Sequence, residues 1–360
     1  MSYRSVKIIL SGGGTGGSVS PLLAVAERMS DFGFRISDFL WIGTRDGVEK
    51  EMVEKADIEF KSIISGKLRR YFSLENLIDP FKIIVGFFQA SAIILKWKPN
   101  IVMSAGSFVS VPVIWAAWFW GVKTMVHQQD VRPGLANRLM APFASVITVA
   151  FKKSLADYGK KAVWTGNPAR RSLALGPRAQ GLGHSLKLKK DVPVVLVVGG
   201  GTGAMAINEV VWESLEKLTK ICQVVHVAGK GKIANAKLRM PNYFVFEILE
   251  HGKLMSVMSK ADVVVTRAGL GLLTEIANLE KAAIIIPIPD SHQEDNARIF
   301  KEKEAAIVLD QEKLNTDGLV DNIKSVLNDK MLSDKLRNNV SKVMKPGANK
   351  NIVKIIERLT

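Results

Sequence analysis

The run from Val263 to Thr266 consists mainly of β-branched residues, and a glycine turn and an apolar helical pattern follow it directly. Short runs of this kind are typical of buried parallel strands. The helical pattern covers Leu272 to Leu279, and a second buried strand is expected from Ala283 to Ile288. Such a strand–turn–helix–strand unit predicts a parallel α/β sheet, whose ligands bind at the carboxyl ends of the strands.

The turn in this unit carries Gly269 and Gly271. Its N–H groups, at a helix N-terminus, can bind an anion such as a diphosphate. Glu275, one turn into the helix, can accept hydrogen bonds from two neighbouring hydroxyls, as on a ribose. Gln293 and Asn296 add uncharged donors and acceptors on the facing loop. An ordinary βαβ unit without a ligand is the alternative, because a glycine turn alone is weak evidence of a site.

The same order of strand, glycine loop and helix occurs twice more. Val6 to Leu10 leads into the loop Gly12 to Gly17, and Val194 to Val198 leads into the loop Gly199 to Ala204. The first loop lacks the acidic partner of a dinucleotide site, which favours a phosphate-sized ligand. Two similar openings predict two Rossmann-like α/β domains that face each other across a cleft lined by both sets of loops.

A chain of 360 residues also favours two domains. The pattern breaks at Thr165–Pro168, so the predicted domains cover residues 1–164 and 165–345. A final helix at about residues 346–360 is expected to return to the first domain.

The net charge of +16 implies an anionic partner, but the basic residues are dispersed and form no nucleic-acid motif. The single cysteine, Cys222, excludes an internal disulfide and fits a reducing cytoplasm. The N-terminal residues lack the pattern of a signal peptide. Neither a cofactor nor a metal ion is expected, because the five histidines are scattered.

Residues 64–98 combine a basic cluster, Lys67, Arg69 and Arg70, with aromatic and aliphatic residues at helical spacing. Part of this stripe must face a core, and the remainder predicts a patch that dips into an anionic membrane surface. Residues 101–122 are uncharged and long enough to span a membrane, but polar residues and glycine divide them into a strand, a loop and a helix. A peripheral location at the cytoplasmic face of the cell membrane is predicted.

Several segments occur together and in order between about residues 6 and 310. They are Gly13–Gly17, Ala105–Pro112, His127–Asp130 followed by Gly134–Asn137, Gly166–Arg170, Gly200–Asn208, Arg267–Glu275 and Gln293–Ala297. In this combination the chain resembles the MurG-type transferases of glycosyltransferase family 28, the bacterial enzymes of peptidoglycan synthesis.

This resemblance implies a GT-B fold and inverting transfer of N-acetylglucosamine from UDP-N-acetylglucosamine to the 4-hydroxyl of undecaprenyl-diphospho-N-acetylmuramoyl-pentapeptide. It implies that Glu275 holds the ribose, that Gln293 contacts the sugar beside Asn296, and that Arg170 and Thr202 help to hold the nucleotide. The diphosphate would meet the backbone near Leu270 to Leu272, and the acceptor side would be lined by Thr15 to Gly17 with Asp130. The substrate-binding positions carried over are Thr15, Gly16, Gly17, Asp130, Arg170, Thr202, Gly203, Arg267, Leu270, Gly271, Leu272, Leu273, Thr274, Glu275, Gln293 and Asn296.

The chain departs from the family pattern at the expected catalytic base. Ser18 occupies the place of the usual histidine after the first glycine motif, and Asp130 that of the usual asparagine. Serine is not a base at neutral pH unaided, so Asp130 and His127, and then Asp46, are the candidate bases. A buried structural role is the alternative for His127. Our hypothesis is that Asp130 supplies the base.

Other functions remain open from the residues alone. They are a nucleic-acid-binding protein, a UDP-sugar epimerase on the same two-domain plan, a related GT-B transferase with a different lipid acceptor such as diacylglycerol, and an inactive homologue.

Overall fold

The computed structural model describes residues 6–66, 75–170, 186, 188–200, 203–233 and 240–360. The chain divides into two compact units. Unit 1 comprises Met1–Arg171 together with Lys345–Thr360, and unit 2 comprises Ser172–Met344. The segment Thr165–Pro168, which the sequence placed at a domain junction, therefore lies inside unit 1.

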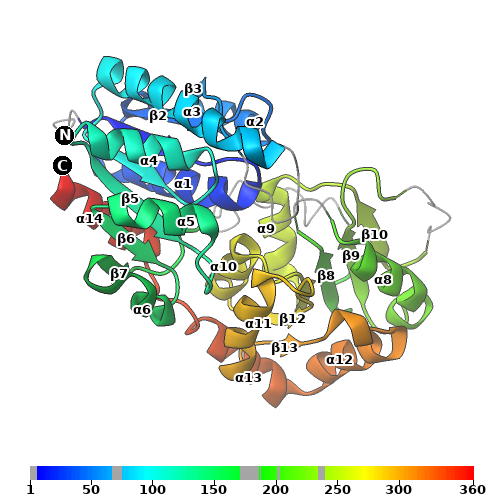
Figure 1. The fold of residues 1–360 in the computed structure, drawn as a ribbon. Helices are drawn as coiled ribbons and strands as arrows, with labels where there is room; N and C mark the ends of the chain where they lie inside the picture. The colour runs from blue at the N-terminus through cyan, green and yellow to red at the C-terminus, as the bar shows by residue number, and fades with distance from the viewer. Residues whose placement is uncertain (1–5, 67–74, 171–185, 187, 201–202, 234–239) are drawn as a thin grey trace. The chain divides into compact units, whose positions relative to one another are not determined.

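Unit 1 contains a parallel 7-stranded sheet in the order β3-β2-β1-β4-β5-β6-β7 (Figure 1). The order reverses between β1 and β4, which pair directly, and ligands of open α/β sheets bind outside the carboxyl ends of the strands at such a point. The strands are β1 (Ile8–Ser11), β2 (Phe39–Gly43), β3 (Glu59–Ser62), β4 (Ile101–Ser104), β5 (Lys123–Gln128), β6 (Val146–Val149) and β7 (Ala162–Trp164).

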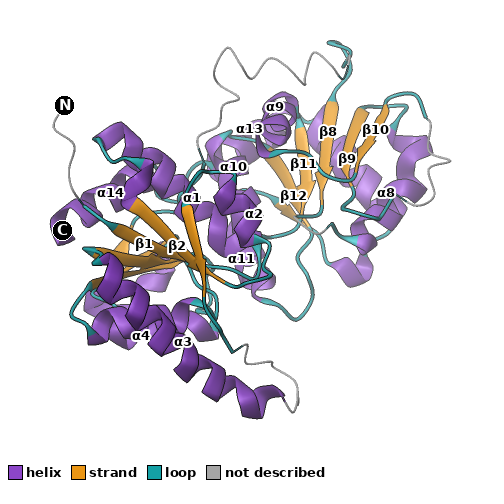
Figure 2. Cartoon of the chain, turned by 90° about the horizontal axis from the view of Figure 1, so that it is seen from above, coloured by secondary structure: helices purple, strands orange, loops and turns teal. Residues whose placement is uncertain are grey.

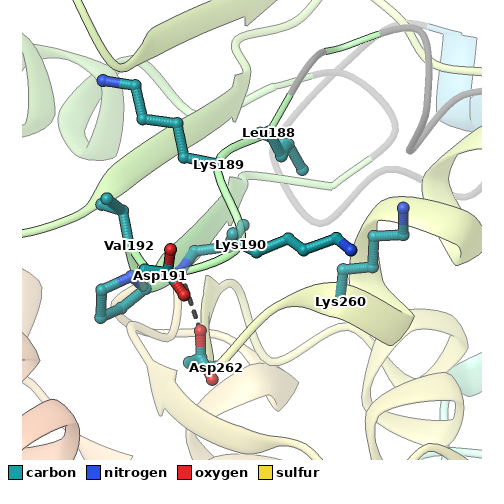
Figure 3. Close-up of a pocket in the computed structure, with 9 residues that line it drawn as sticks. Leu188, Lys189, Lys190, Asp191, Val192, Lys260 and Asp262 are labelled. Carbon is teal, nitrogen blue, oxygen red and sulfur yellow. Dashed lines mark hydrogen bonds between the residues drawn. The ribbon is translucent and has the colours of Figure 1, made fainter.

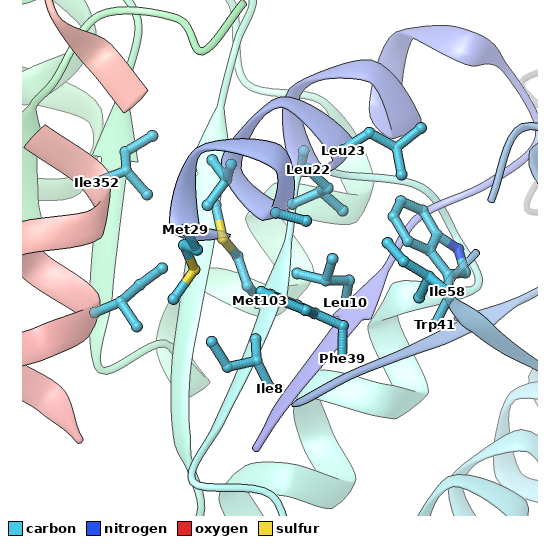
Figure 4. Close-up of a cluster of buried hydrophobic side chains, with 14 of the residues drawn as sticks. Ile8, Leu10, Leu22, Leu23, Met29, Phe39, Trp41, Ile58, Met103 and Ile352 are labelled. Atoms are coloured by element: carbon cyan, nitrogen blue, oxygen red, sulfur yellow. The ribbon is translucent and has the colours of Figure 1, made fainter. Parts of the chain in front are cut away.

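Helices cover both faces of this sheet (Figure 2). One face packs against α1 (Gly16–Met29) and α14 (Ala348–Leu359), and Figure 4 shows Ile352 of α14 in the same buried cluster as Met29 of α1. The other face packs against α3 (Glu75–Trp97), α4 (Ser110–Phe119) and α5 (Leu135–Met140). Two shorter helices, α2 (Glu49–Glu54) and α6 (Leu155–Tyr158), complete the unit.

The start of the C-terminal helix α14 is fixed to unit 1 by contacts with α1 and with the segment after β7. Gly166 has a left-handed φ of +84°, and a Cβ there would lie 2.1 Å from the carbonyl oxygen of Lys345. The Asn349 side-chain amide donates to the carbonyls of Ala24, at 3.0 Å, and Ala169, at 2.9 Å. Only glycine fits at residue 166, because a side chain there would collide with the backbone of Lys345.

The uncharged segment at residues 101–122 forms β4, a loop and α4, as predicted, and not one long helix. Within the described residues, Ile78–Trp97 of α3 is the one helical stretch whose length and composition would allow it to cross a membrane. A third of that window is buried in the protein, where Ala90 and Ile94 join the sheet core. These contacts make α3 a covering helix of the sheet.

Unit 2 repeats the plan with a parallel 6-stranded sheet in the order β10-β9-β8-β11-β12-β13. This is the strand order 3-2-1-4-5-6 of dinucleotide-binding folds, and its reversal lies between β8 and β11. Its strands are β8 (Val194–Val198), β9 (Gln223–Val227), β10 (Tyr243–Phe246), β11 (Val263–Thr266), β12 (Ala282–Ile285) and β13 (Ile307–Val308).

In the described part of unit 2, a helix follows each of the strands β8, β10, β11, β12 and β13. The helices are α8 (Met205–Leu218), α9 (His251–Lys260), α10 (Leu270–Asn278), α11 (His292–Glu302), α12 (Thr316–Asn328) and α13 (Lys330–Val340). Short 3-10 helices in the two units lie at Ser30–Phe32, Ile36–Asp38, Ala141–Phe143, Lys152–Ser154, Gly159–Lys161 and Gln311–Lys313.

Candidate functional site

The first candidate site lies at the reversal point of unit 1, where the loops after β1 and β4 meet. The Ser110 hydroxyl, at the start of α4, donates to the carbonyl of Ser11 at 2.9 Å and lies 3.0 Å from that of Gly106. The two glycine loops are therefore joined where the topology places a ligand.

The first glycine loop is held by side chains from three directions. The Trp41 indole donates to the Gly12 carbonyl at 3.0 Å, and the Ser18 hydroxyl lies 3.1 Å from the Gly13 carbonyl. The N–H of Gly14 donates to Glu49 at 3.0 Å. Ser18 is thus buried and braces the loop.

Helix α1 begins directly after this loop. Thr15 is its N-cap residue and makes no side-chain capping bond, and Gly16 and Gly17 are its first two helical residues. The first N–H groups of a helix lack partners within the helix, and the helix dipole favours an anion there. Thr15 and Gly17 are exposed and Gly16 is partly buried, so this terminus is open to an anion. The sequence analysis expected the helix to begin at Pro21.

Gln129, directly after β5, connects both glycine loops. Its side-chain amide donates to the Gly17 carbonyl at 2.9 Å and lies 3.3 Å from the Ala105 carbonyl. Asp130 follows it and is only partly buried. The end of β5 thus places Asp130 beside a segment that is fixed to both loops.

The structure contradicts the prediction that His127 is a base. Its side chain is fully buried, with Nδ1 2.9 Å from Oγ1 of Thr148 and Nε2 2.8 Å from Oδ1 of Asn167. Burial lowers the pKa of His127 to about 4, because the charged form is poorly solvated. His127 is a structural histidine that links β5 to β6 and to the segment after β7. Asp46 is exposed.

Arg170 was predicted to hold the nucleotide, but the structure pairs it with α1. Its Nε and Nη2 groups donate to Oε1 of Glu27 at 2.8 and 2.6 Å. Both residues belong to unit 1, and the bonds help to fix the segment that precedes the end of that unit. The Arg170 guanidinium is thus bonded to Glu27, and its contact with the nucleotide stays a prediction.

The second candidate site lies at the reversal point of unit 2, where α10 begins after β11. Gly269 is the N-cap residue with φ −79°, so its backbone would accept other residues. A Cβ on Gly269 or Gly271 would meet nothing within 4 Å. Open space above the helix N-terminus allows a diphosphate to approach the backbone closely. Gly271 is helical, whereas the sequence analysis placed it in the turn.

Glu275 lies on α10 beyond this turn and is buried, with 7% of the residue exposed. Its Oε1 lies 3.9 Å from Nε2 of His251, the first residue of α9. A carboxylate and an imidazole at this separation offer hydroxyl groups an acceptor and a second polar partner. His251 was missed by the sequence analysis.

Arg267, Gln293 and Asn296 brace the turn that carries this site. Arg267 donates to the carbonyls of Ile286 and Pro287, both at 3.0 Å. The Oε1 of Gln293 accepts from Ala268 N–H at 3.2 Å, and the buried Asn296 donates to the Ala268 carbonyl at 3.1 Å. The side chains of Arg267 and Asn296 therefore support the turn, and their predicted ligand contacts stay predictions. In these bonds Gln293 uses only its side-chain oxygen.

The remaining predicted positions on α10 divide between core and surface. Leu270, Leu273 and Thr274 are buried, and the Thr274 hydroxyl donates to the Leu270 carbonyl at 2.6 Å. A ligand contact at these three positions would therefore be made through the backbone, and their role in binding stays a prediction. Gly271 and Leu272 are partly exposed.

The third glycine loop follows β8. Thr202 lies outside the described residues. Gly203 has a left-handed φ of +74°, and a Cβ there would lie 2.1 Å from the Ala228 carbonyl oxygen. The Gly203 carbonyl accepts from Nζ of Lys232 at 3.1 Å. Gly203 is therefore required by the packing of this loop against the end of β9.

A cavity of about 600 Å³ lies at the opposite edge of the unit 2 sheet (Figure 3). It is lined by residues 188–194, Lys260 and Asp262, at the amino ends of β8 and β11. Within the lining of this cavity, Asp262 accepts a hydrogen bond from the Val194 N–H at 2.8 Å. Because ligands of such sheets bind at the carboxyl ends of the strands, this cavity is not the candidate site.

Two parallel sheets, each with glycine turns at its reversal point, define the GT-B fold class of two Rossmann-like domains. The chain belongs to glycosyltransferase family 28: the family's N-terminal domain matches residues 8–149, and its C-terminal domain matches residues 194–356.

Curated relatives agree with this assignment. A Clostridium kluyveri protein is 39% identical over 89% of this chain and 91% of its own length. A Legionella pneumophila strain Paris protein is 38% identical over 98% of this chain and 97% of its own. Both are named UDP-N-acetylglucosamine--N-acetylmuramyl-(pentapeptide) pyrophosphoryl-undecaprenol N-acetylglucosamine transferase.

Solved structures show the same fold. Acinetobacter baumannii MurG has a TM-score of 0.75 at 23% identity, covering 98% of this chain and 99% of that one. A putative UDP-N-acetylglucosamine 2-epimerase from Listeria monocytogenes has a TM-score of 0.70 at 15% identity, covering 99% and 96%. Transferases and epimerases share this architecture, so the fold alone does not distinguish the two activities.

Proposed function

We propose that the protein transfers N-acetylglucosamine from UDP-N-acetylglucosamine to the 4-hydroxyl of undecaprenyl-diphospho-N-acetylmuramoyl-pentapeptide. Relatives that carry this activity in their names align with nearly the whole chain at 38% identity. The structural observation that supports it best is Glu275, a nearly buried carboxylate on α10 just beyond an open glycine turn.

The donor binds to unit 2 in this proposal. The N-terminus of α10 holds the diphosphate through its N–H groups, and Glu275 accepts hydrogen bonds from the two ribose hydroxyls. The side-chain NH₂ group of Gln293 reaches the sugar, because its oxygen is engaged by the N–H groups of Ala268 and Ile288.

The acceptor binds to unit 1. Its diphosphate meets the N-terminus of α1 at Thr15 to Gly17, and Asp130 takes the proton of the attacking 4-hydroxyl. That oxygen forms a bond to the anomeric carbon of the donor sugar while the bond from this carbon to the β-phosphate oxygen breaks. The leaving UDP carries the electron pair and is stabilised by the α10 N-terminus. One displacement of this kind inverts the anomeric configuration.

The lipid-linked acceptor requires contact with a membrane, and an apolar face of unit 1 fits this need. Phe81 and Phe88 of α3 are 68% and 66% exposed, and the ring of Phe87 lies 5.8 Å from that of Phe119 on α4. The exposed large apolar residues of the two helices and the turn after α4 are Ile78, Phe81, Ile84, Val85, Phe88, Leu95, Trp118, Phe119 and Trp120.

Attachment through this face is peripheral. Each inserted aromatic side chain contributes about 1.5–3 kcal/mol, and each basic residue near an anionic leaflet about 1 kcal/mol. Lys67, Arg69 and Arg70, the basic residues predicted for this patch, lie outside the described residues. In this proposal the contacted surface is the cytoplasmic face of the cell membrane.

The test is a reaction of the protein with UDP-N-acetylglucosamine and the lipid-linked muramoyl acceptor in detergent. We expect release of UDP together with a lipid-linked disaccharide whose new linkage is β. A parallel reaction without acceptor distinguishes transfer from epimerisation. Isomerised donor in that reaction, with no disaccharide in the complete one, would overturn the proposal in favour of an epimerase.

A further inference from the structure

A buried carboxylate lies directly beneath the first glycine loop. Glu49, the first residue of α2, is 0% exposed. Its side chain turns toward the loop after β1. An ionised group removed from water is costly unless hydrogen bonds replace its hydration, so its partners indicate what it does.

The partners of Glu49 all come from two loops. Oε2 accepts from the N–H of Gly14 at 3.0 Å. Oε1 accepts from the N–H of Thr44 at 2.8 Å and from the Thr44 hydroxyl. Glu49 therefore joins the glycine loop after β1 to the loop after β2, and it makes no ion pair with a basic residue in the described parts of the chain.

Glycines enclose the carboxylate on both sides. A Cβ on Gly13 would lie 2.2 Å from Oε1, and a Cβ on Gly47 would lie 2.0 Å from Oε2. Gly14 has a left-handed φ of +77°, which turns its N–H inward onto Glu49. Residues 13 and 47 must therefore be glycine to leave room for the carboxylate. Residue 14 must be glycine because its left-handed backbone directs its N–H at Glu49.

We propose that Glu49 is a positioning residue for the acceptor-binding loop. By holding the Gly14 N–H inward, it sets the backbone of Thr15 to Gly17 so that the first N–H groups of α1 point at the acceptor diphosphate. This inference rests on the proposed function for the identity of the ligand. Glu49 does not touch the substrate, and it acts only through the loop.

The Glu49→Gln variant tests this role at nearly constant volume. A glutamine has one acceptor oxygen and one NH₂ group, so either the Gly14 N–H or the Thr44 N–H faces a donor. We expect the KM for the lipid-linked acceptor to rise about tenfold or more, since a lost charge-assisted bond and an unsatisfied donor both loosen the loop. The Kd for UDP-N-acetylglucosamine should stay within about twofold, because the donor binds in unit 2.

Asp38→Asn is the matched control. Asp38 is also buried in unit 1 and accepts from the Arg35 N–H at 2.8 Å, but it precedes β2, whereas the loops lie beyond the other end. It should affect stability without raising the acceptor KM. Thr44→Val removes only the hydroxyl donor and should raise the acceptor KM by a smaller factor. This variant tests the inference if Glu49→Gln does not fold.

Amide hydrogen exchange of the loop gives a readout independent of activity. In Glu49→Gln the Gly14 amide should exchange at least about tenfold faster than in wild type, whereas strand β1 should be unchanged. A wild-type acceptor KM and unchanged Gly14 exchange in Glu49→Gln would overturn the inference. Wild-type protein that exchanges normally but transfers no sugar would instead overturn the proposed function and leave the positioning of the loop intact.

Discussion

The side-chain amide of Gln129 donates to the carbonyl of Gly17 at 2.9 Å, in the first turn of helix α1. An uninterrupted helix would bond this carbonyl to the N–H of residue 21, but Pro21 has none. Gln129 therefore replaces a missing helical hydrogen bond, and in doing so it fixes the end of β5 to the N-terminus of α1, where we propose that the acceptor binds.

Replacing Gln129 tests whether its side-chain amide takes the place of the N–H that Pro21 lacks. Gln129→Ala leaves the Gly17 carbonyl unsatisfied and should lower the free energy of unfolding by about 1–3 kcal/mol. In the Pro21→Ala background the N–H of Ala at residue 21 can donate to the Gly17 carbonyl. Gln129→Ala should therefore lower the free energy of unfolding by less in that background. A double-mutant cycle by urea denaturation measures the difference, and equal costs in both backgrounds would contradict the arrangement.

Glu275→Ala should weaken the binding of UDP-N-acetylglucosamine by about a hundredfold or more, because two hydrogen bonds to a charged acceptor contribute about 1.5–3 kcal/mol each. Isothermal titration calorimetry measures this directly. Glu302→Ala, which changes an exposed glutamate at the end of α11, is the control and should bind as wild type. Unchanged affinity in Glu275→Ala would show that the ribose is held elsewhere.

The strands were readable from the sequence because buried parallel strands are continuous apolar runs. Val194–Val198 and Val263–Thr266 match the predicted strands residue for residue. The starts of α1 and α10 were placed too late, since glycines read as turn residues are helical at Gly16, Gly17 and Gly271. Glycine at a helix N-terminus leaves no local signal that separates it from a turn.

The candidate site was predicted only in part, because local sequence patterns do not identify the partners of its side chains. Motifs located the segments, but the partners of their side chains lie far away in the chain. Arg170 pairs with Glu27, 143 residues earlier, and Gln129 reaches Gly17 across 112 residues. Local patterns carry no information on such contacts, so the bond between Arg170 and Glu27 could not be predicted.

Asp130→Asn should lower kcat by about a hundred- to ten-thousandfold, the usual contribution of a general base, with little change in KM. With His127 enclosed between Thr148 and Asn167, Asp130 is the remaining candidate at the end of β5. Asp46→Asn, at an exposed position, should retain wild-type kcat. Full turnover of a soluble acceptor analogue by Asp130→Asn would exclude it as the base.

The apolar face of α3 should control membrane attachment. Exchanging both Phe81 and Phe88 for serine removes two inserted rings, worth about 1.5–3 kcal/mol each, so binding to anionic liposomes should fall by about a hundredfold or more. Met331→Ser, at an 85% exposed position in unit 2, is the matched control. Co-sedimentation with vesicles gives the partition coefficient, and equal values for the double variant and wild type would argue against this face.

Acid should destabilise both units through two buried histidines. Burial lowers the pKa of His127 in unit 1 and of His226 in unit 2 to about 4. His226 lies 3.0 Å from the Tyr243 hydroxyl and 2.9 Å from Oδ1 of Asn208, so it is enclosed as His127 is. In the unfolded chain both imidazoles return to their ordinary value of about 6.5.

The unfolded state therefore binds more protons than the native state between pH values of about 6.5 and 4, and stability falls as the pH falls through this window. At a pH of about 5 each histidine should cost about 2 kcal/mol relative to neutral pH. Urea denaturation followed by tryptophan fluorescence measures the slope, since Trp212 is bonded to Tyr243 at 3.1 Å beside His226. His226→Gln should lower stability at neutral pH yet flatten the acid dependence of unit 2, whereas His292→Gln, at an exposed position, should leave the slope unchanged. An acid dependence that His226→Gln does not flatten would mean that this histidine is not held neutral by burial.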